Sequence, residues 1–111
     1  MTEHQNVSRA LAALGHEARL DIFRLLVKAG HDGMTVGQIS GHLGLAASTL
    51  AHHLRMLVDA GLVAQQKNGR EVVNTVNFDE MDHIIAFLTD NCCAGVPANT
   101  VTAPDVARQK G

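Results

Sequence analysis

Residues 35–61 read TVGQISGHLGLAASTLAHHLRMLVDAG, and this stretch decides the fold that we predict for the chain. Thr35 followed by Gln38 has the form of a capping box, which predicts the start of a short helix. Gly44 is expected to end that helix, because glycine adopts a positive φ without steric cost. Apolar residues at helical spacing then predict a second helix over residues 46–60. Two short helices joined by a tight turn form a helix-turn-helix.

The two faces of the second predicted helix differ in chemistry. Leu50, Leu54, Leu57 and Val58 form an apolar stripe that we expect to face the core. The opposite face carries small and hydrogen-bonding side chains, which suit a close approach to base edges and phosphates. An ordinary solvated helix face is the alternative interpretation. The residues expected to bind DNA on this helix are Ala47, Ser48, Thr49, His52 and Arg55.

The next stretch, LVAQQKNGREVVNTVNF, predicts a β-hairpin. Asn68 and Gly69 lie between two β-rich runs, and this pair is typical of a type I′ turn, in which both central residues need a positive φ. Lys67 and Arg70 flank the tip of the hairpin, where we expect them to contact DNA. A helix-turn-helix followed by a basic-tipped hairpin is a winged helix.

Three segments of the chain are ALGHEARLDIFRLL, STLAHHLRMLVDAGLV and the KNGREV hairpin, all within residues 7–93. Together they resemble the ArsR/SmtB family of bacterial winged-helix repressors. The resemblance implies a homodimer that binds double-stranded operator DNA and leaves it when an inducer, often a metal or metalloid, binds. Ala46 and Ala47 depart from the family, which often has a serine and a glutamine there. The Cys-x-Cys sequence that many members carry is absent, so any metal site is expected elsewhere.

The composition fits one small domain with an aliphatic core. Of 111 residues, 46% are apolar, and the net charge is −2. The charge is polarised: residues 44–70 carry three basic side chains against Asp59, whereas residues 79–90 carry four acidic side chains and no basic one. We expect a domain over residues 1–95 and a flexible tail over residues 96–111. No stretch suits a membrane span or a signal peptide, so a cytoplasmic location and no membrane partner are expected.

Further helices are expected on both sides of the motif, over residues 7–14, 17–29 and 78–91. The apolar face of residues 81–88 is wide for so small a domain and needs a partner. The resemblance implies that the first and last helices pair across a dimer axis. The predicted fold class is therefore mainly α with a β-hairpin, a dimeric winged helix-turn-helix of about five helices. Val7, Leu11 and Leu14 share one face of the first helix, which either packs on its own domain or forms a dimer contact. The residues expected on the core face of the second helix are Leu20, Phe23, Leu26 and Val27.

Two adjacent cysteines, Cys92 and Cys93, are the sharpest candidates for ligand chemistry. Their Cα atoms lie about 3.8 Å apart across a trans peptide, which is shorter than the separation of about 4.4–6.8 Å in ordinary disulfides. Thiolates select soft ions, and zinc needs four ligands that one chain cannot easily supply with His83 nine residues back. As(III) or Sb(III) takes three soft ligands, so the third would be a small thiol, water or a methyl group.

Vicinal cysteines at this end of the last helix also resemble those of arsenic-responsive members of the family. Other members use such cysteines for redox or persulfide sensing. A third interpretation, which needs no ligand, treats both cysteines as small buried hydrophobes. We therefore expect an As(III) or Sb(III) inducer and no organic cofactor.

The sequence does not favour an enzyme, because no nucleophile, base and oxyanion site stand out together. Among seven histidines, only His52 is assigned a function. His16 is expected to cap a helix, His53 to be packed and hydrogen-bonded in the interior, and His4 to lie in a frayed terminus. We thus predict a DNA-binding repressor released by trivalent arsenic or antimony. The alternatives are a thiol redox or persulfide sensor, and a winged-helix interaction module without DNA binding.

Overall fold

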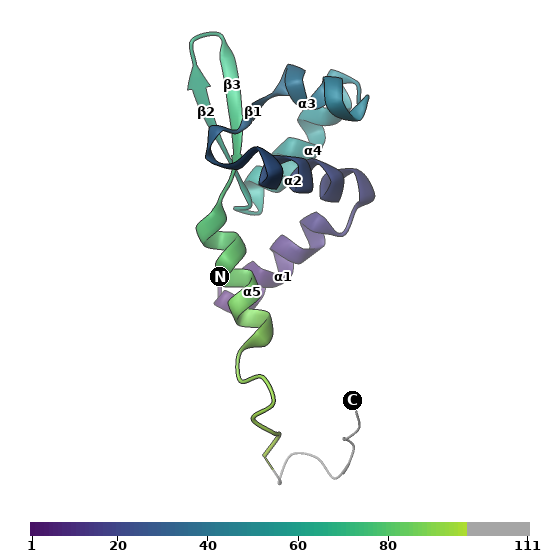
Figure 1. Cartoon of the computed structure of the whole chain (residues 1–111). Coiled ribbons are helices and arrows are strands. Elements are labelled where there is room, and N and C mark those ends of the chain that lie inside the picture. Colours follow the sequence, from purple (N-terminus) through teal and green to yellow (C-terminus); the bar gives the residue numbers. More distant parts are fainter. Residues whose placement is uncertain (98–111) are drawn as a thin grey trace.

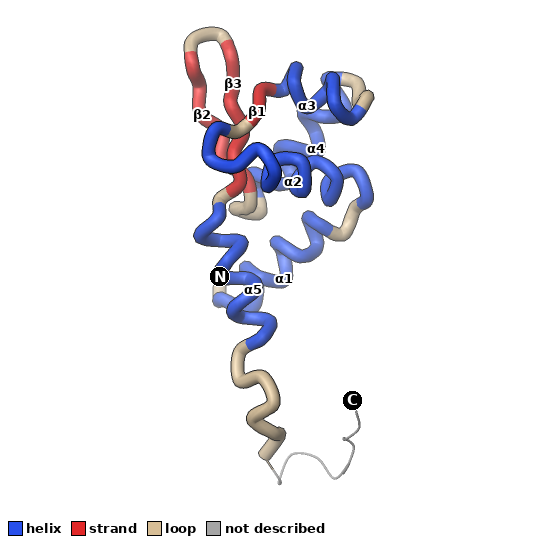
Figure 2. The backbone as a smooth tube through the Cα atoms, viewed as in Figure 1, coloured by secondary structure: helices blue, strands red, loops and turns tan. Residues whose placement is uncertain are grey.

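A computed structural model of the chain describes residues 1–97. This part of the chain contains five α-helices and three strands, so the predicted winged helix-turn-helix is confirmed. Figures 1 and 2 show how these elements are arranged. A one-turn 3₁₀ helix, η1, and the short strand β1 were not predicted. The elements are α1 (Glu3–Leu14), α2 (Glu17–Ala29), η1 (Gly30–Asp32), β1 (Met34–Thr35), α3 (Val36–Leu43), α4 (Ala47–Asp59), β2 (Val63–Asn68), β3 (Glu71–Val76) and α5 (Phe78–Thr89).

The helix-turn-helix forms as the sequence predicts. Thr35 and Gln38 make the capping box that begins α3, and Gly44 ends it in the left-handed conformation. The Ser40 hydroxyl donates a hydrogen bond of 2.7 Å to the carbonyl of Leu45, which holds the turn that follows. Helix α4 then buries Leu50, Leu54 and Leu57 at 0–1% exposure against the inward residues of α2 and α3. This burial fixes the rotation of α4 about its axis.

The first helix begins earlier than predicted. Thr2 and Gln5 form a second capping box, with the Gln5 N–H donating to Thr2 Oγ1 at 3.1 Å and the Thr2 N–H donating to Gln5 Oε1 at 3.0 Å. His4 therefore lies inside α1, and the frayed terminus expected there is wrong. The capping box satisfies backbone donors that a frayed end would leave to water.

The predicted core face of α2 is partly wrong, and the predicted apolar face of α1 is only partly packed on its own domain. Leu11, Leu20 and Val27 are 39%, 43% and 36% exposed. Ala13 and Ile22 are buried instead, because each helix is turned toward the core by part of a turn. Both helices are apolar around much of their circumference, so periodicity alone does not select the buried face.

The three strands form an antiparallel sheet in the order β1-β3-β2. Asn68 pairs with Glu71, so the hairpin turn consists of Gly69 and Arg70 rather than Asn68 and Gly69. Gly69 has a φ of 67°, and the only non-glycine residues with positive φ among those described lie beyond α5. The predicted type I′ turn is therefore wrong. A positive φ at the first central residue alone is the pattern of a type II′ turn, which suits the twist of a hairpin equally well.

The molecule has two ends, which Figure 1 displays at the top and bottom of the view. The wing end holds the β2–β3 hairpin together with α3 and α4. The α1–α5 end holds those two helices and the turn that follows α5. Within residues 1–97, no helix is long and apolar enough to cross a lipid bilayer. The tail predicted over residues 96–111 lies outside the described residues, apart from its first two.

Candidate functional site

The outward face of α4 presents the residues that the sequence analysis assigned to DNA. All five are exposed, while Leu50, Leu54 and Leu57 on the opposite face are buried. Ala46 precedes the helix and makes no side-chain hydrogen bond to its first turn. The N–H groups of that turn therefore remain available to an acceptor such as a phosphate oxygen. The exposed residues are Ala47, Ser48, Thr49, His52 and Arg55.

The two basic residues of the wing are also exposed. Lys67 lies on β2, and Arg70 is the second residue of the turn. Neither forms an ion pair with another residue of the described part of the chain. Both side chains can therefore reach outward from the hairpin. The structure brings the α4 face and the wing to the same end of the molecule (Figure 1).

His53 lies directly beneath this surface and is buried, as predicted. Its ring is 4.8 Å from that of His16, which caps α2 by accepting the Ala18 N–H at 3.1 Å, and 5.8 Å from that of His52. The predicted hydrogen bond is wrong, because Nδ1 of His53 has no partner among the described residues. Desolvation lowers the pKa of His53, and the nearby His16, Arg19 and His52 lower it further. A neutral imidazole is therefore favoured on the buried face of α4.

Cys92 and Cys93 lie in a hydrogen-bonded turn just after α5, which ends at Thr89 rather than at Asn91. Asn91 and Cys93 have φ values of 58° and 65°, which non-glycine residues rarely adopt. This backbone sets the two sulfur atoms side by side, 3.1 Å apart, whereas successive side chains on a helix diverge by about 100°. Both thiols are free and exposed, so packing as buried hydrophobes is wrong.

The thiol of Cys92 is harder to deprotonate than an ordinary cysteine thiol. A hydrogen bond with Cys93 raises the pKa of Cys92 above its ordinary value, and a smaller contribution from desolvation acts in the same direction. Among the described residues, no group of three or more His, Cys, Asp or Glu side chains lies close enough together to hold a metal ion. His83, the nearest histidine in sequence, instead contacts Glu3 through Nε2 and Oε2 at 2.8 Å.

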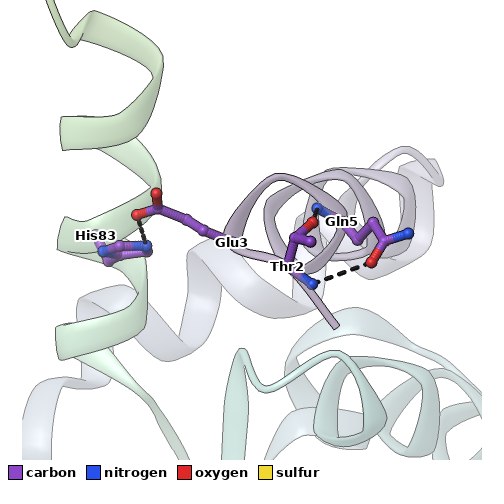
Figure 3. Close-up of polar contacts among 4 residues, drawn as sticks. All are labelled: Thr2, Glu3, Gln5 and His83. Carbon is purple, nitrogen blue, oxygen red and sulfur yellow. Dashed lines mark hydrogen bonds and ion pairs between the residues drawn. The ribbon is translucent and has the colours of Figure 1, made fainter.

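That contact links α1 to α5, and Figure 3 shows Glu3 reaching across to His83 from beside the capping box of α1. The apolar part of the same surface is only partly covered. Ile85 and Leu88 are 54% and 60% exposed, whereas Ile84, expected on the open face, is 5% exposed and belongs to the core. A groove of about 260 Å³ between the two helices is lined by His4, Val7, Ser8, Leu11, Phe87 and Leu88.

Helix α1 also contacts the end of α4. The guanidinium of Arg9 donates a hydrogen bond of 3.4 Å to the backbone carbonyl of Asp59, the last residue of α4. The sequence analysis did not single out Arg9, because a lone basic residue on a short amphipathic helix gives no signal of its partner. The contacts of α1 therefore extend from α5 on one side to α4 on the other.

Comparisons with known proteins agree with this architecture. Residues 14–66 match a family described as a helix-turn-helix domain. An arsenical resistance operon repressor from Staphylococcus xylosus is 31% identical over 96 residues, covering 82% of this chain and 89% of that protein. The HTH-type transcriptional regulator YgaV from Escherichia coli (strain K12) is 28% identical over 89 residues, with coverage of 80% and 88%.

A solved structure shows the same likeness in three dimensions. It is an ArsR-like transcriptional regulator from Rhodococcus sp. RHA1, which superposes with a TM-score of 0.68 at 26% identity. The superposition covers 77% of each chain.

Proposed function

The chain belongs to the ArsR/SmtB family of winged-helix transcriptional repressors, and from this membership we propose that it binds operator DNA as a homodimer and is released by trivalent arsenic or antimony at Cys92 and Cys93. The observation that carries the proposal is the pair of exposed, free thiols whose sulfur atoms lie 3.1 Å apart after α5. A relative named for arsenical resistance supports the same class of inducer.

The DNA contacts that we propose come from two elements. Ser48, His52 and Arg55 on α4 would lie in the major groove, where hydroxyl, imidazole and guanidinium groups can read base edges. Lys67 and Arg70 on the wing would contact phosphates, which contributes affinity without sequence preference. Two copies of the chain would place two α4 helices about one DNA turn apart, as in other dimeric helix-turn-helix proteins.

The dimer that we propose forms through α1 and α5. Ile85 and Leu88 are more than half exposed in the single chain, and the groove between α1 and α5 is apolar on both sides. Covering the exposed part of each side chain would contribute about 1–2 kcal/mol, because little more than half of its surface remains to be buried. A second copy of the same surface satisfies this need with twofold symmetry, which is the commonest arrangement of homodimers.

The thiol pair suits arsenous acid, As(OH)₃, by an exchange that needs no oxidant. Each S–H bond breaks as an As–S bond forms, and the proton leaves with a displaced hydroxide as water. The raised pKa of Cys92 does not oppose this exchange, because the thiol proton is consumed in forming water. A redox or persulfide sensor needs a thiolate as its nucleophile, and the response to polysulfide distinguishes that alternative from the arsenic sensor. The third arsenic position would keep a hydroxide or take a small thiol.

Release of DNA requires a physical connection between the thiols and α4. The turn that carries the cysteines continues directly from α5, α5 contacts α1 through the Glu3–His83 pair, and α1 contacts the end of α4 through Arg9. An ion that re-forms the turn after α5 would shift α5 within the dimer. We propose that this shift changes the spacing of the two α4 helices, so that both no longer fit their half-sites.

The test is a titration of DNA-bound protein. The protein first selects its preferred duplex from a random pool, and fluorescence anisotropy then follows release on addition of arsenite or polysulfide. Cys92→Ser and Cys93→Ser should bind the duplex as the wild type does but should not release it with arsenite, because one thiol supplies only one As–S bond. Ala94→Ser, which adds the same hydroxyl while keeping both thiols, is the matched control.

Three results would contradict the proposal. Release of the Cys92→Ser/Cys93→Ser double variant by arsenite would place the inducer site elsewhere. Release of the wild type by polysulfide but not by arsenite would favour the redox sensor. Failure to select any duplex, with no salt-dependent DNA binding at all, would favour an interaction module.

A further inference from the structure

Asn74 is a buried polar residue on β3, the central strand of the sheet, at the base of the wing. Its side chain is 0% exposed, at a position of β3 that faces inward together with Val76. A strand in this setting ordinarily carries an apolar residue at such a position, because burial of an amide is costly unless its hydrogen bonds are satisfied. The buried amide of Asn74 is therefore expected to have hydrogen-bond partners for both its oxygen and its nitrogen.

Both ends of the Asn74 amide are hydrogen-bonded, each to a different strand. Nδ2 donates to the backbone carbonyl of Met34 on β1 at 3.1 Å, and Oδ1 accepts from Nε2 of Gln65 on β2 at 2.8 Å. Met34 and Gln65 are also the residues that pair with Asn74 in the sheet. The side chain of Asn74 thus links its own strand to both neighbouring strands, within one row of paired residues across the sheet.

The row connects the wing to the start of the helix-turn-helix. Strand β1 ends at Thr35, which is the N-cap of α3, so Met34 is only two residues from the first residue of that helix. Gly33, immediately before Met34, packs so closely on β3 that a Cβ atom there would lie 2.4 Å from the carbonyl oxygen of Asn74. The backbone leading into α3 is therefore held against the base of the wing at two consecutive residues.

We propose that Asn74 is a positioning residue for DNA binding, which fixes the hairpin relative to α3 and α4 so that the wing and α4 engage one duplex together. This inference rests on the proposed function, in which Lys67 and Arg70 contact phosphates. A buried polar side chain is well suited to the task, because it has one hydrogen-bonded arrangement, whereas an apolar side chain tolerates several packings. Lys67 and Arg70 extend beyond this row, at the far end of the hairpin.

The experiment measures affinity for a mixed-sequence duplex of about 30 base pairs, long enough for two half-sites one turn apart, at several salt concentrations. Removing both wing cations in Lys67→Ala/Arg70→Ala should reduce the slope of log K against log salt by about 3.6, at roughly 0.9 for each of four phosphates in a dimer. Asn74→Leu, which keeps the number and branching of the side-chain heavy atoms, should lower the slope by about half of that or more and weaken binding at least tenfold. Combined with Lys67→Ala/Arg70→Ala, it should cause no further loss.

A merely structural role would lower stability without changing the salt slope. Circular dichroism therefore accompanies each measurement, and a second pair of variants keeps the test independent of folding. Gln65 is exposed, and Gln65→Leu removes one of the two hydrogen bonds of the Asn74 side chain. It should lower the salt slope, but by less than Asn74→Leu does. Gln66→Leu, its exposed neighbour on β2, should leave the slope unchanged.

Three results would overturn the inference, each in a distinguishable way. A wild-type slope in Gln65→Leu and in folded Asn74→Leu, while Lys67→Ala/Arg70→Ala lowers it, would remove the positioning role alone. A wild-type slope in Lys67→Ala/Arg70→Ala would remove the wing from the DNA interface, and the role of Asn74 with it. Losses from Asn74→Leu and Lys67→Ala/Arg70→Ala that simply add would also exclude the role, because independent sites are additive.

Discussion

At the wing end, one chain supplies nearly everything that its elements need. Helix α4 buries its leucines at 0–1% exposure, the capping box of α3 is complete, and the hairpin has a buried, hydrogen-bonded amide at its base. At the α1–α5 end, Ile85 and Leu88 are more than half exposed, and the cysteines lie outside every helix. The elements that carry the surface proposed for DNA are therefore packed and hydrogen-bonded within one chain. The surface proposed for dimerisation and sensing instead requires a second molecule or a ligand.

The largest expected effect comes from a substitution at the α1–α5 end. Leu88→Glu should give monomers, because a charge buried in the interface is very costly. Operator affinity should then fall by about 10²- to 10⁴-fold, since two half-sites are no longer bound by one linked pair. Sedimentation velocity and DNA titration would measure both effects.

The matched control for that change is Leu20→Glu, on the exposed face of α2. A dimer that persists in Leu88→Glu would exclude this interface. Ile84→Glu is a poor probe, because Ile84 is in the core of its own chain and the variant should unfold.

At the wing end, Arg70→Ala should weaken binding to every duplex by roughly 10- to 100-fold at about 0.1 M salt and lower the salt slope by about 1.8, one phosphate for each wing of a dimer. Ser48→Ala should instead change which sequence is preferred, because base contacts specify and phosphate contacts do not. Arg24→Ala removes the same charge from the exposed face of α2 and should leave the salt slope unchanged. An unchanged slope in Arg70→Ala would separate the wing from DNA.

The smallest effect concerns His53, whose buried Nδ1 has no hydrogen-bond partner among the described residues. The pKa of His53 is lowered from 6.5 in the folded chain, so unfolding takes up a proton near that pH. The stability contributed by neutral His53 is fully present above pH 6.5 and is lost as the pH falls toward the folded pKa. His53→Leu should stabilise the fold by about 1 kcal/mol, because it removes an unpaired buried nitrogen.

Urea unfolding between pH 5 and 8 would check this expectation. The pH dependence of the free energy of unfolding should be weaker in His53→Leu than in the wild type. His42→Leu, on the exposed side of α3, provides the comparison for loss of an exposed imidazole. Equal pH dependence in the wild type and His53→Leu would show that His53 does not titrate on unfolding.

Most of the wing end was predictable from the sequence, because its signals are local. A capping box, a glycine after a helix and a leucine repeat each act within one turn, and α3 and α4 follow them closely. The turn of the hairpin was misplaced by one residue, because Gly69 serves either a type I′ or a type II′ turn and only the pairing of Asn68 with Glu71 decides between them.

The remaining errors concern partners that are distant in sequence. Nothing near His53 indicates that its Nδ1 lacks a hydrogen bond, and nothing near Asn74 indicates that it bonds to Met34, 40 residues away. The start of α1 is different: Thr2 and Gln5 repeat the pattern of Thr35 and Gln38, so the signal was present in a stretch whose polar composition concealed it. The sequence shows that Cys92 and Cys93 are adjacent, but their shared, exposed turn depends on positive φ values that the sequence does not display.

The turn that carries Cys92 and Cys93 has a consequence for how such a protein can change over evolutionary time. Backbone hydrogen bonds from Cys92 to Thr89 and from Ala94 to Asn91 hold the turn, its two thiols hydrogen-bond to each other, and its side chains lie outside the core. Substitutions there leave every buried residue in place. A descendant lineage could therefore change the side-chain chemistry of this turn within a few codons without disturbing the core that holds α4.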